Sequence, residues 1–233
     1  VIGTLTIANK EDGTRFTTED LEMVSTIASQ ASVAINNARL YEEQQRTYLS
    51  TVQALVSAIE ANDAYTRGHS ERVTRYAIAI AEEMGLPPQT VRLLNQASIL
   101  HDIGKIGIDV ALLNKDEKLT DLDREVLQRH PEVGRQILEP IHFLCDISDI
   151  VAQHHEMHDG TGYPAGLKGN EILLEARILA VADTFDAMTS NRPYRNARLR
   201  EDAIEEIRSM SGTQFAPDVV EAFLRVVDSE AAA

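Results

Sequence analysis

Hydrophobic residues recur at helical spacing along most of this chain, and only the first residues alternate as a strand does. Residues 1–8 are β-branched and alternating, and the turn-forming stretch NKEDGTR follows them, so we predict one short strand here. The pattern changes at Thr17, which forms a predicted capping box with Asp20. No glycine or proline interrupts the chain from there to about Asn62. This stretch predicts one very long helix or two helices that abut.

A heptad repeat runs along this predicted helix. Its a and d positions are Leu21, Val24, Ala28, Ala31, Ile35, Ala38, Glu42, Gln45, Leu49, Val52, Val56 and Ile59. Only Glu42 and Gln45 among them are polar. The repeat suits a parallel connector between two domains, through which the chain would form a homodimer. It equally suits two halves that each pack on their own domain, with the polar pair at the boundary.

The remaining hydrophobic periodicity predicts shorter helices separated by glycine and proline. We expect them over residues 70–84, 89–102, 120–130, 147–157, 175–190, 200–210 and 217–228. The stretch DGTGYPAGLKGN at 159–170 holds four glycines and a proline, so we predict a loop. Apart from the first residues, the pattern therefore predicts an all-α protein.

Composition and charge narrow the classes of partner. The 233 residues are 43% hydrophobic, which is enough for a sizeable core, and their formal net charge is −15. This charge argues against binding to duplex nucleic acid or to an anionic membrane surface. A single cysteine, Cys145, excludes an internal disulfide and favours the cytoplasm. The chain starts without methionine inside a strand-like pattern, so we interpret it as part of a longer protein.

Histidines and aspartates supply the candidate chemistry, centred on the pair His101-Asp102 in HDIGKIG. A neutral imidazole beside a carboxylate is a ready contact for a divalent metal, and Asp183 lies in an apolar run where a bare carboxylate would be costly to bury. The candidate ligands, each expected at or near a helix end, are His69, His101, Asp102, His130, His154, His155 and Asp183. Without thiolates, this set suits zinc, manganese, iron or nickel. Seven ligands predict a binuclear site, in which Asp102 could bridge ions about 3.5–4 Å apart.

Four motifs together resemble the HD-GYP phosphodiesterases, a branch of the HD metal-dependent phosphohydrolases. They are HDIGK at 101–105, HHEMHDGTGYPAGLKG at 154–169, ARILAVADTFDAMTS at 176–190 and RPYR at 192–195. Residues 1–46 resemble more loosely the last strand and helix of an α/β GAF-like sensory domain. The resemblance implies three parts: the GAF-like fragment at 1–46 running into a connector helix, an all-α HD-GYP domain at 47–228, and a disordered tail at 229–233.

The family resemblance also implies an activity and a role for each ligand. Such a domain hydrolyses cyclic di-GMP to pGpG, and in many members on to GMP, under control of a sensory domain. The implied first metal is held by His69, His101, Asp102 and Asp183, and the second by Asp102, His130, His154 and His155. Iron or manganese is the first expectation for both ions, with zinc and nickel as alternatives. The rival hypotheses are an HD-type hydrolase of another cyclic nucleotide and a receptor that binds without turnover.

Other positions acquire implied roles beside substrate. Lys105 is expected to be catalytic together with Asp102, by offsetting charge on the phosphate or protonating the leaving oxygen. Tyr163, Arg192 and Arg195 are expected to contact substrate. Asp186 is predicted either to contact substrate or to be a solvated cap of the next helical turn. Glu156 and Asp159 are expected to brace the loop and orient the histidine doublet.

Departures from the family pattern give two further expectations. The family's Pro-Asp and Pro-Gly positions are occupied by Asp109-Val110 and Asp116-Glu117, so the loop at 109–118 should be less rigid than usual. Some members hold a third ion through a glutamate four residues before the first ligand histidine, where this chain has Tyr65. A neutral phenol is a poor ligand at neutral pH, so we expect two metals rather than three.

Overall fold

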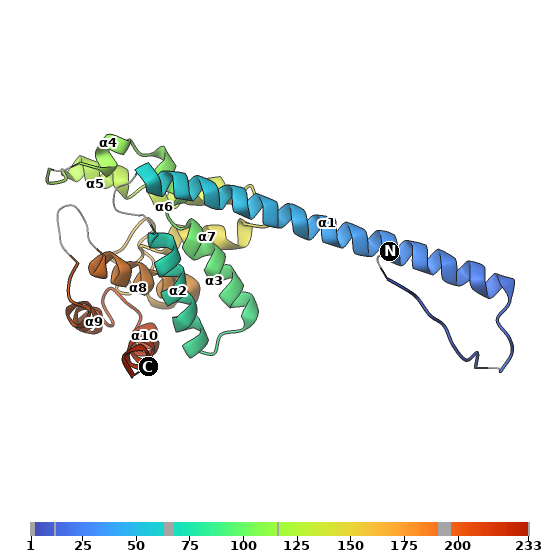
Figure 1. Cartoon of the computed structure of the whole chain (residues 1–233). Helices are drawn as coiled ribbons and strands as arrows, with labels where there is room; N and C mark the ends of the chain where they lie inside the picture. The colour runs from blue at the N-terminus through green and yellow to red at the C-terminus, as the bar shows by residue number, and fades with distance from the viewer. Residues whose placement is uncertain (1–2, 12, 63–67, 116, 191–196, 233) are drawn as a thin grey trace. The chain divides into compact units, whose positions relative to one another are not determined.

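The computed structural model describes residues 3–11, 13–62, 68–115, 117–190 and 197–232. Within these residues it divides into two compact units, Val1–Thr51 and Val52–Ala233. In chain order the α-helices are α1 (Thr18–Asn62), α2 (His69–Glu83), α3 (Pro88–Leu100), α4 (Val110–Leu113), α5 (Asp121–Leu127), α6 (His130–Leu138), α7 (Cys145–Gln153), α8 (Leu174–Thr189), α9 (Arg200–Ser209) and α10 (Pro217–Ala232), labelled in Figure 1. Two 3₁₀ helices, η1 (Ile103–Gly107) and η2 (Gly169–Glu171), complete the set.

The first unit consists of an irregular segment followed by most of α1. The long helix is continuous, as one of the two alternatives predicted, and the expected capping box begins it: the Thr17 amide donates to Asp20 (2.7 Å) and the Asp20 amide to the Thr17 hydroxyl (3.2 Å). The predicted strand is wrong for residues 3–8, which have no regular structure. A strand needs a neighbour to share its hydrogen bonds, and the described part of this chain offers none.

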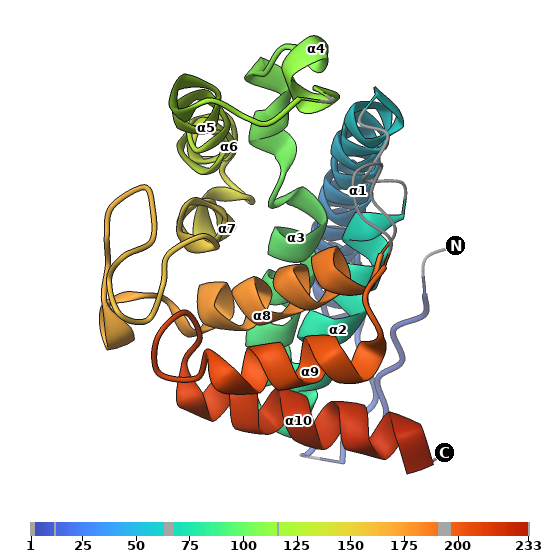
Figure 2. The ribbon, with the colours of Figure 1, turned by 90° about the vertical axis from the view of Figure 1, so that its left-hand side faces the viewer.

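The second unit is a bundle in which α8 packs on α2, α3, α7, α9 and α10. Figure 2 shows α8, α9 and α10 lying roughly side by side. A line of aromatic rings joins three helices of the core: Phe185 of α8 lies 4.9 Å from Tyr76 of α2 and 5.0 Å from Phe223 of α10, between ring centroids. Edge-on ring packing of this kind adds to the stabilisation that burial alone gives. None of the described helices is both long and apolar enough to span a membrane.

Glycine and capping residues set most helix boundaries where the sequence predicts them. Gly85 follows the end of α2 with φ of +68°, a left-handed conformation that costs glycine little, and the Leu86 amide donates to the Ala81 carbonyl (3.0 Å) to close the turn. Thr120 caps α5 through a box with Asp123. The tail predicted to be disordered from residue 229 is instead helical as far as Ala232, because a Ser-Glu-Ala-Ala run continues a helix readily.

Three other predicted elements differ from the structure. The helix expected over 120–130 ends at Leu127, and a separate helix, α6, begins at His130 with Pro131 in its first turn, a position that proline favours. The loop expected at 109–118 contains the short helix α4, which Asp109 caps by accepting from the Ala111 amide (2.8 Å). α7 ends at Gln153, so the histidine doublet follows the helix rather than lying in its last turn.

Candidate metal centre

The structure brings all seven predicted ligands together from five helices. His69 begins α2, His101 caps the end of α3 with Asp102 next to it, His130 begins α6, and His154 caps α7. Asp183 lies within α8, not near its end as predicted. Three groups have their ligand atoms within 4.8 Å of one another: His69, His101 and Asp183; His101, Asp102 and His154; and His130, His154 and His155.

Three of these histidines are oriented by the backbone three residues before them. The Nδ1 atom of His101 donates to the Ser98 carbonyl (2.7 Å), that of His130 to Leu127 (2.8 Å), and that of His154 to Val151 (2.6 Å). A carbonyl only accepts hydrogen bonds, so each Nδ1 must carry the proton. In the neutral imidazole each Nε2 then presents a lone pair. These are the carbonyls that a helix end leaves without partners.

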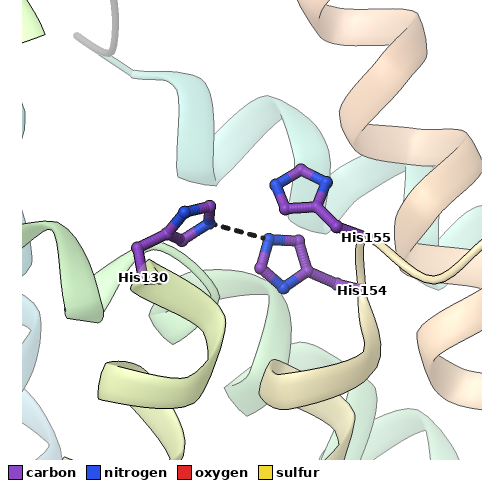
Figure 3. Close-up of side chains that lie close together, drawn as sticks. All are labelled: His130, His154 and His155. Carbon is purple, nitrogen blue, oxygen red and sulfur yellow. Dashed lines mark hydrogen bonds between the residues drawn. The ribbon is translucent and has the colours of Figure 1, made fainter. Parts of the chain in front are cut away.

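The Nε2 lone pairs of these histidines point into one buried space. The Nε2 atoms of His130 and His154 lie 3.3 Å apart, as Figure 3 shows with His155 beside them. Nε2 of His101 is fully buried and finds no hydrogen-bond partner among the described residues. Leaving such an acceptor unsatisfied costs about 1–3 kcal/mol. Facing acceptors of this kind are what a metal cation satisfies, so the donor set fits the divalent ion that the motifs imply.

Burial keeps the group of His130, His154 and His155 neutral. It lowers the pKa of His130, lowers that of His154 well below the usual value, and lowers that of His155 to about 4. A metal binds the deprotonated imidazole, so these histidines need not lose a proton at neutral pH before they bind one.

His69 is held differently, between two carboxylates of α8. Its Nε2 lies 3.2 Å from Asp183 Oδ1, and its Nδ1 lies 2.7 Å from Asp186 Oδ2. Burial acts to lower the pKa of His69, but the hydrogen bonds with Asp183 and Asp186 outweigh it and raise that pKa to about 10. Binding a cation at Nε2 would therefore release a proton.

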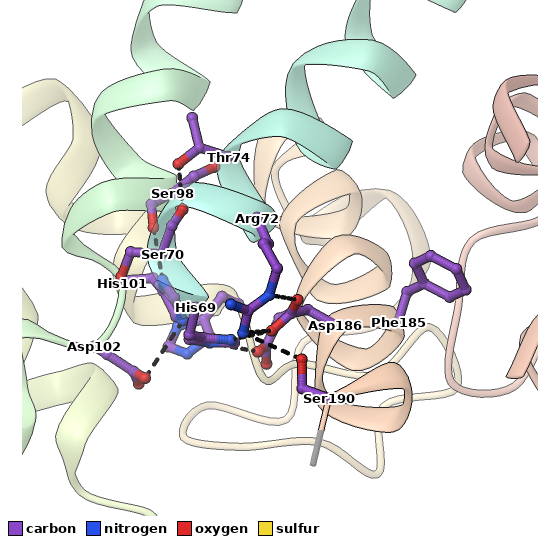
Figure 4. Close-up of polar contacts among 12 residues, drawn as sticks. His69, Ser70, Arg72, Thr74, Ser98, His101, Asp102, Phe185, Asp186 and Ser190 are labelled. Atoms are coloured by element: carbon purple, nitrogen blue, oxygen red, sulfur yellow. Dashed lines mark hydrogen bonds and ion pairs between the residues drawn. The ribbon is translucent and has the colours of Figure 1, made fainter. Parts of the chain in front are cut away.

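Of the two roles predicted for Asp186, the solvated cap is wrong, and contact with substrate stays a prediction. Asp186 is 2% exposed, so it is not a solvated cap, and both of its oxygens are engaged within the protein. Besides His69, the guanidinium of Arg72 contacts both carboxylate oxygens, with Nε 2.5 Å from Oδ1 and Nη2 3.0 Å from Oδ2 (Figure 4). Arg72 is not among the predicted site residues, although its place three residues after His69 puts both on one face of α2.

Asp102 lies between the group of His69, His101 and Asp183 and the group of His130, His154 and His155. Its Oδ1 is 3.4 Å from Nε2 of His130, and its Oδ2 is 3.5 Å from Nε2 of His101. Lys105 contacts the same Oδ2 at 2.6 Å. Burial acts to raise the pKa of Asp102, but the charge of Lys105 leads the effects that outweigh it and hold this pKa well below its usual range. Asp102 is therefore an ionised carboxylate within reach of both groups.

The 3₁₀ helix η1, which follows His101-Asp102, packs with its backbone directly against α6. Gly104 makes this close approach possible. A Cβ at Gly104 would lie 1.9 Å from the His130 carbonyl oxygen and 2.6 Å from the Gly134 amide nitrogen. Real side chains do not fit at such distances, so only glycine lets the HDIGK segment pack against the helix that carries His130.

The loop predicted at 159–170 is fastened beside the histidine doublet. Glu156, 3% exposed, accepts from the amides of Ala165 (2.7 Å) and Leu167 (3.0 Å), and Asp159 accepts from the Thr161 amide (2.9 Å). The prediction that these carboxylates brace the loop is thereby confirmed. The Tyr163 ring lies 4.9 Å from the ring of His155, between centroids, and burial raises the pKa of its hydroxyl. Tyr163 thus lines the site as a neutral phenol.

Several predicted positions lie outside the described residues. They are Tyr65, with the question of a third ion, and the two arginines of the RPYR motif, Arg192 and Arg195. Ser190, the last described residue before that motif, accepts a hydrogen bond from Arg72 Nη2 (3.1 Å).

Comparison with known proteins finds relatives of this sequence. The sequence is 41% identical over 186 residues to the cyclic di-GMP phosphodiesterase response regulator RpfG of Xanthomonas campestris, covering 79% of this chain and 48% of that protein. It is 42% identical over 190 residues to a cyclic di-GMP phosphodiesterase of Thermotoga maritima, covering 80% and 51%. The chain thus spans about half the length of these curated relatives.

A solved structure has a similar fold, and a family model matches most of the chain. The crystal structure of a cyclic GMP-AMP specific phosphodiesterase of V. cholerae, V-cGAP3, is similar with a TM-score of 0.60 and 20% identity, covering 77% of this chain and 48% of that one. The HD domain family matches residues 53–219, and these include all seven candidate ligands. This chain belongs to the HD domain family.

Proposed function

We propose that residues 47–228 are a metal-dependent phosphodiesterase that hydrolyses cyclic di-GMP to pGpG, with GMP as a further product to be tested. The observation that carries the proposal is the pair of histidine groups on either side of the ionised Asp102, with acceptor nitrogens facing one another at 3.3 Å. The two relatives named as cyclic di-GMP phosphodiesterases support the choice of substrate.

Two divalent ions fit the donor set, iron or manganese before zinc or nickel. His69, His101 and Asp183 would hold one ion, His130, His154 and His155 the other, and Asp102 would contact both, because it lies between the groups. When bound, such metals activate water and neutralise charge on a phosphodiester. The proposed number of two rests on Tyr65 replacing a glutamate ligand.

The chain's own residues supply positioning and charge. Lys105 contacts Asp102, and it would turn its ammonium to the phosphate when an ion beside Asp102 balances the carboxylate charge in its place. The neutral Tyr163 would border the substrate beside His155, and the loop that Glu156 fastens would keep the Tyr163 ring in place. Arg192 and Arg195 are proposed to hold phosphate or a guanine edge.

The alternative activity is hydrolysis of another cyclic dinucleotide. The solved structure with the same fold is named as specific for cyclic GMP-AMP, so the HD fold does not itself set the base. A receptor without turnover is the alternative of another class. The complete ligand set and the presence of Lys105 count against it, since a receptor has no need of either.

One experiment separates these hypotheses. Protein purified without oxygen is analysed for metal and then incubated with cyclic di-GMP and with cyclic GMP-AMP, and the products are separated by chromatography. We expect two ions per chain and conversion of cyclic di-GMP to pGpG. Preferential cleavage of cyclic GMP-AMP would mean that this nucleotide, rather than cyclic di-GMP, is the substrate. Binding without any product would mean that the domain is a receptor rather than an enzyme. Three fully occupied ions per chain would contradict the argument from Tyr65.

We also propose regulation through α1, by a homodimer that connects an N-terminal GAF-like sensory domain to the HD domain in the cytoplasm. Apolar positions of the heptad repeat support it, since Leu21 is 64% and Ile35 46% exposed. Polar residues at a and d positions fix register at a cost in stability. Replacing Glu42 and Gln45 by leucine should therefore tighten the dimer and hold activity at one level. A monomer by light scattering at micromolar concentration would contradict the dimer.

A further inference from the structure

Arg72 holds Asp186 with a two-point contact. Its Nε and Nη2 atoms contact the two oxygens of the carboxylate at 2.5 Å and 3.0 Å, and Nη2 also donates to the Ser190 hydroxyl at 3.1 Å. Paired contacts between a guanidinium and a carboxylate fix orientation as well as adding stability. Asp186 is 2% exposed, so water does not compete strongly for either oxygen.

Asp186 in turn determines which nitrogen of His69 faces the ligand group. Its Oδ2 accepts from Nδ1 at 2.7 Å, which directs Nε2 toward Asp183 at 3.2 Å. The histidines at 101, 130 and 154 use backbone carbonyls for the same purpose. Among the histidines whose Nδ1 contacts are described above, His69 alone depends on a side chain, and that side chain needs a partner to stay in place.

Asp183 and Asp186 lie three residues apart on α8, so both face α2. Either carboxylate could in principle turn to a cation near His69. Arg72 occupies both oxygens of Asp186 and leaves Asp183 in the group with His69 and His101. The arrangement separates two chemically identical side chains into one that binds and one that orients.

We infer that Arg72 is a positioning residue, which acts through Asp186 to fix His69 and thereby sets the affinity of the His69, His101 and Asp183 group for its ion. This inference rests on the proposed metal site. Loss of such an orienting partner typically weakens metal binding about 10- to 100-fold. In the group of His130, His154 and His155, backbone carbonyls rather than Asp186 orient His130 and His154, so this group should keep its affinity.

The chain contains a matched control on the same helix. Arg75, three residues further along α2, is exposed and stacks on the ring of Tyr76, 4.9 Å from its centroid. Arg75→Gln removes the same charge as Arg72→Gln but leaves the contact with Asp186 intact. Arg72→Lys is the complementary variant, since it keeps the charge and loses the planar fork.

The test is calorimetric titration of Mn²⁺ into each metal-free protein, whose folding is checked by circular dichroism. We expect two binding steps in the unaltered protein, and one of them weakened about 10- to 100-fold in Arg72→Gln and measurably in Arg72→Lys. Arg75→Gln should bind as the unaltered protein does. Asp186→Asn should weaken the same step, and combining it with Arg72→Gln should add little, because both act through one contact.

Each contrary outcome is decisive. Unchanged Mn²⁺ affinity in Arg72→Lys together with weaker binding in Arg75→Gln would mean that only overall charge matters, and the inference would fail. Additive effects of the Arg72 and Asp186 variants would show that they act independently and would also overturn it. An unaltered protein that binds no Mn²⁺ would refute the metal site itself, and with it the inference. Binding by the unaltered protein and equally by every variant would refute the inference alone.

Discussion

Replacing Gly104 by alanine tests whether backbone contact between η1 and α6 sets the geometry of the site. The added Cβ would lie 1.9 Å from the His130 carbonyl oxygen, whereas ordinary contact begins at 3.4 Å. The two segments must therefore separate by about 1.5 Å, because neither side is a flexible side chain that could yield. Asp102 and His130, whose facing atoms are 3.4 Å apart, lie on opposite sides of that contact and would separate with it.

The loss of stability expected for Gly104→Ala can be compared with that of Gly107→Ala, a nearby control. Overpacking a core costs about 1–3 kcal/mol, and backbone pressed on backbone belongs at the upper end. About 3 kcal/mol lowers the melting temperature of a domain of this size by roughly 6–12 °C. Gly107 lies in the same 3₁₀ helix, but a Cβ there would meet only Val133 Cγ1 at 3.7 Å, an ordinary contact. Gly107→Ala should therefore be nearly neutral.

Thermal unfolding of both metal-free variants, followed by Mn²⁺ titration, measures the two effects separately. We expect Gly104→Ala to lower the melting temperature and to weaken Mn²⁺ binding at least about 10-fold, the lower end for a disturbed ligand arrangement. Gly107→Ala should change neither. Equal melting temperatures and equal affinities in the two variants would refute the assignment of Gly104 to this close approach.

Three further substitutions test separate parts of the site. Asp102→Ala should remove Mn²⁺ binding and turnover, since this one carboxylate lies within reach of both His101 and His130. Mass spectrometry measures the metal content, and a variant that keeps all its metal and its activity would exclude the site. Lys105→Ala should keep its metal yet lower kcat about 10²–10³-fold, as expected for loss of one charge-stabilising donor, and loss of metal instead would show that its assigned role is wrong. Glu156→Gln can accept only one of two loop amides, so hydrogen exchange at residues 157–168 should speed up by an amount corresponding to about 1.5–3 kcal/mol. Glu171→Gln is its control, because the remaining amide oxygen can still accept from the single Lys168 amide that Glu171 contacts. Identical exchange in both variants would contradict the bracing role.

Most helices could be predicted because they depend on local signals, whereas the convergence of ligands distant in sequence was expected from the four motifs and the family that they resemble. Glycine, proline and capping residues end helices wherever they occur, and histidines at several helix ends already indicate a shared site. α6 was missed because Pro131 resembles a helix breaker, although proline is favoured in a first turn. Nine residues are also too few for hydrophobic periodicity to reveal a helix clearly.

The role of Asp186 could not be predicted, because it depends on residues distant in sequence. Asp186 meets Arg72 across 114 positions and His69 across 117, and no spacing rule connects residues so far apart. The short strand was wrong for a related reason. Alternation shows that a segment would fit a sheet, but a strand forms only when another part of the chain pairs with it.

The two ways of orienting histidines imply an order in which the site is completed during folding. The histidines at 101, 130 and 154 are oriented across three residues, so each is oriented as soon as the helix that precedes it has formed its C-terminal end. His69 becomes oriented only when α8 has docked on α2, since its partner is 117 residues away. Partly folded chains should therefore bind metal weakly. We expect a newly made chain to acquire its full metal complement after folding rather than during it, so that tight metal binding marks a finished domain.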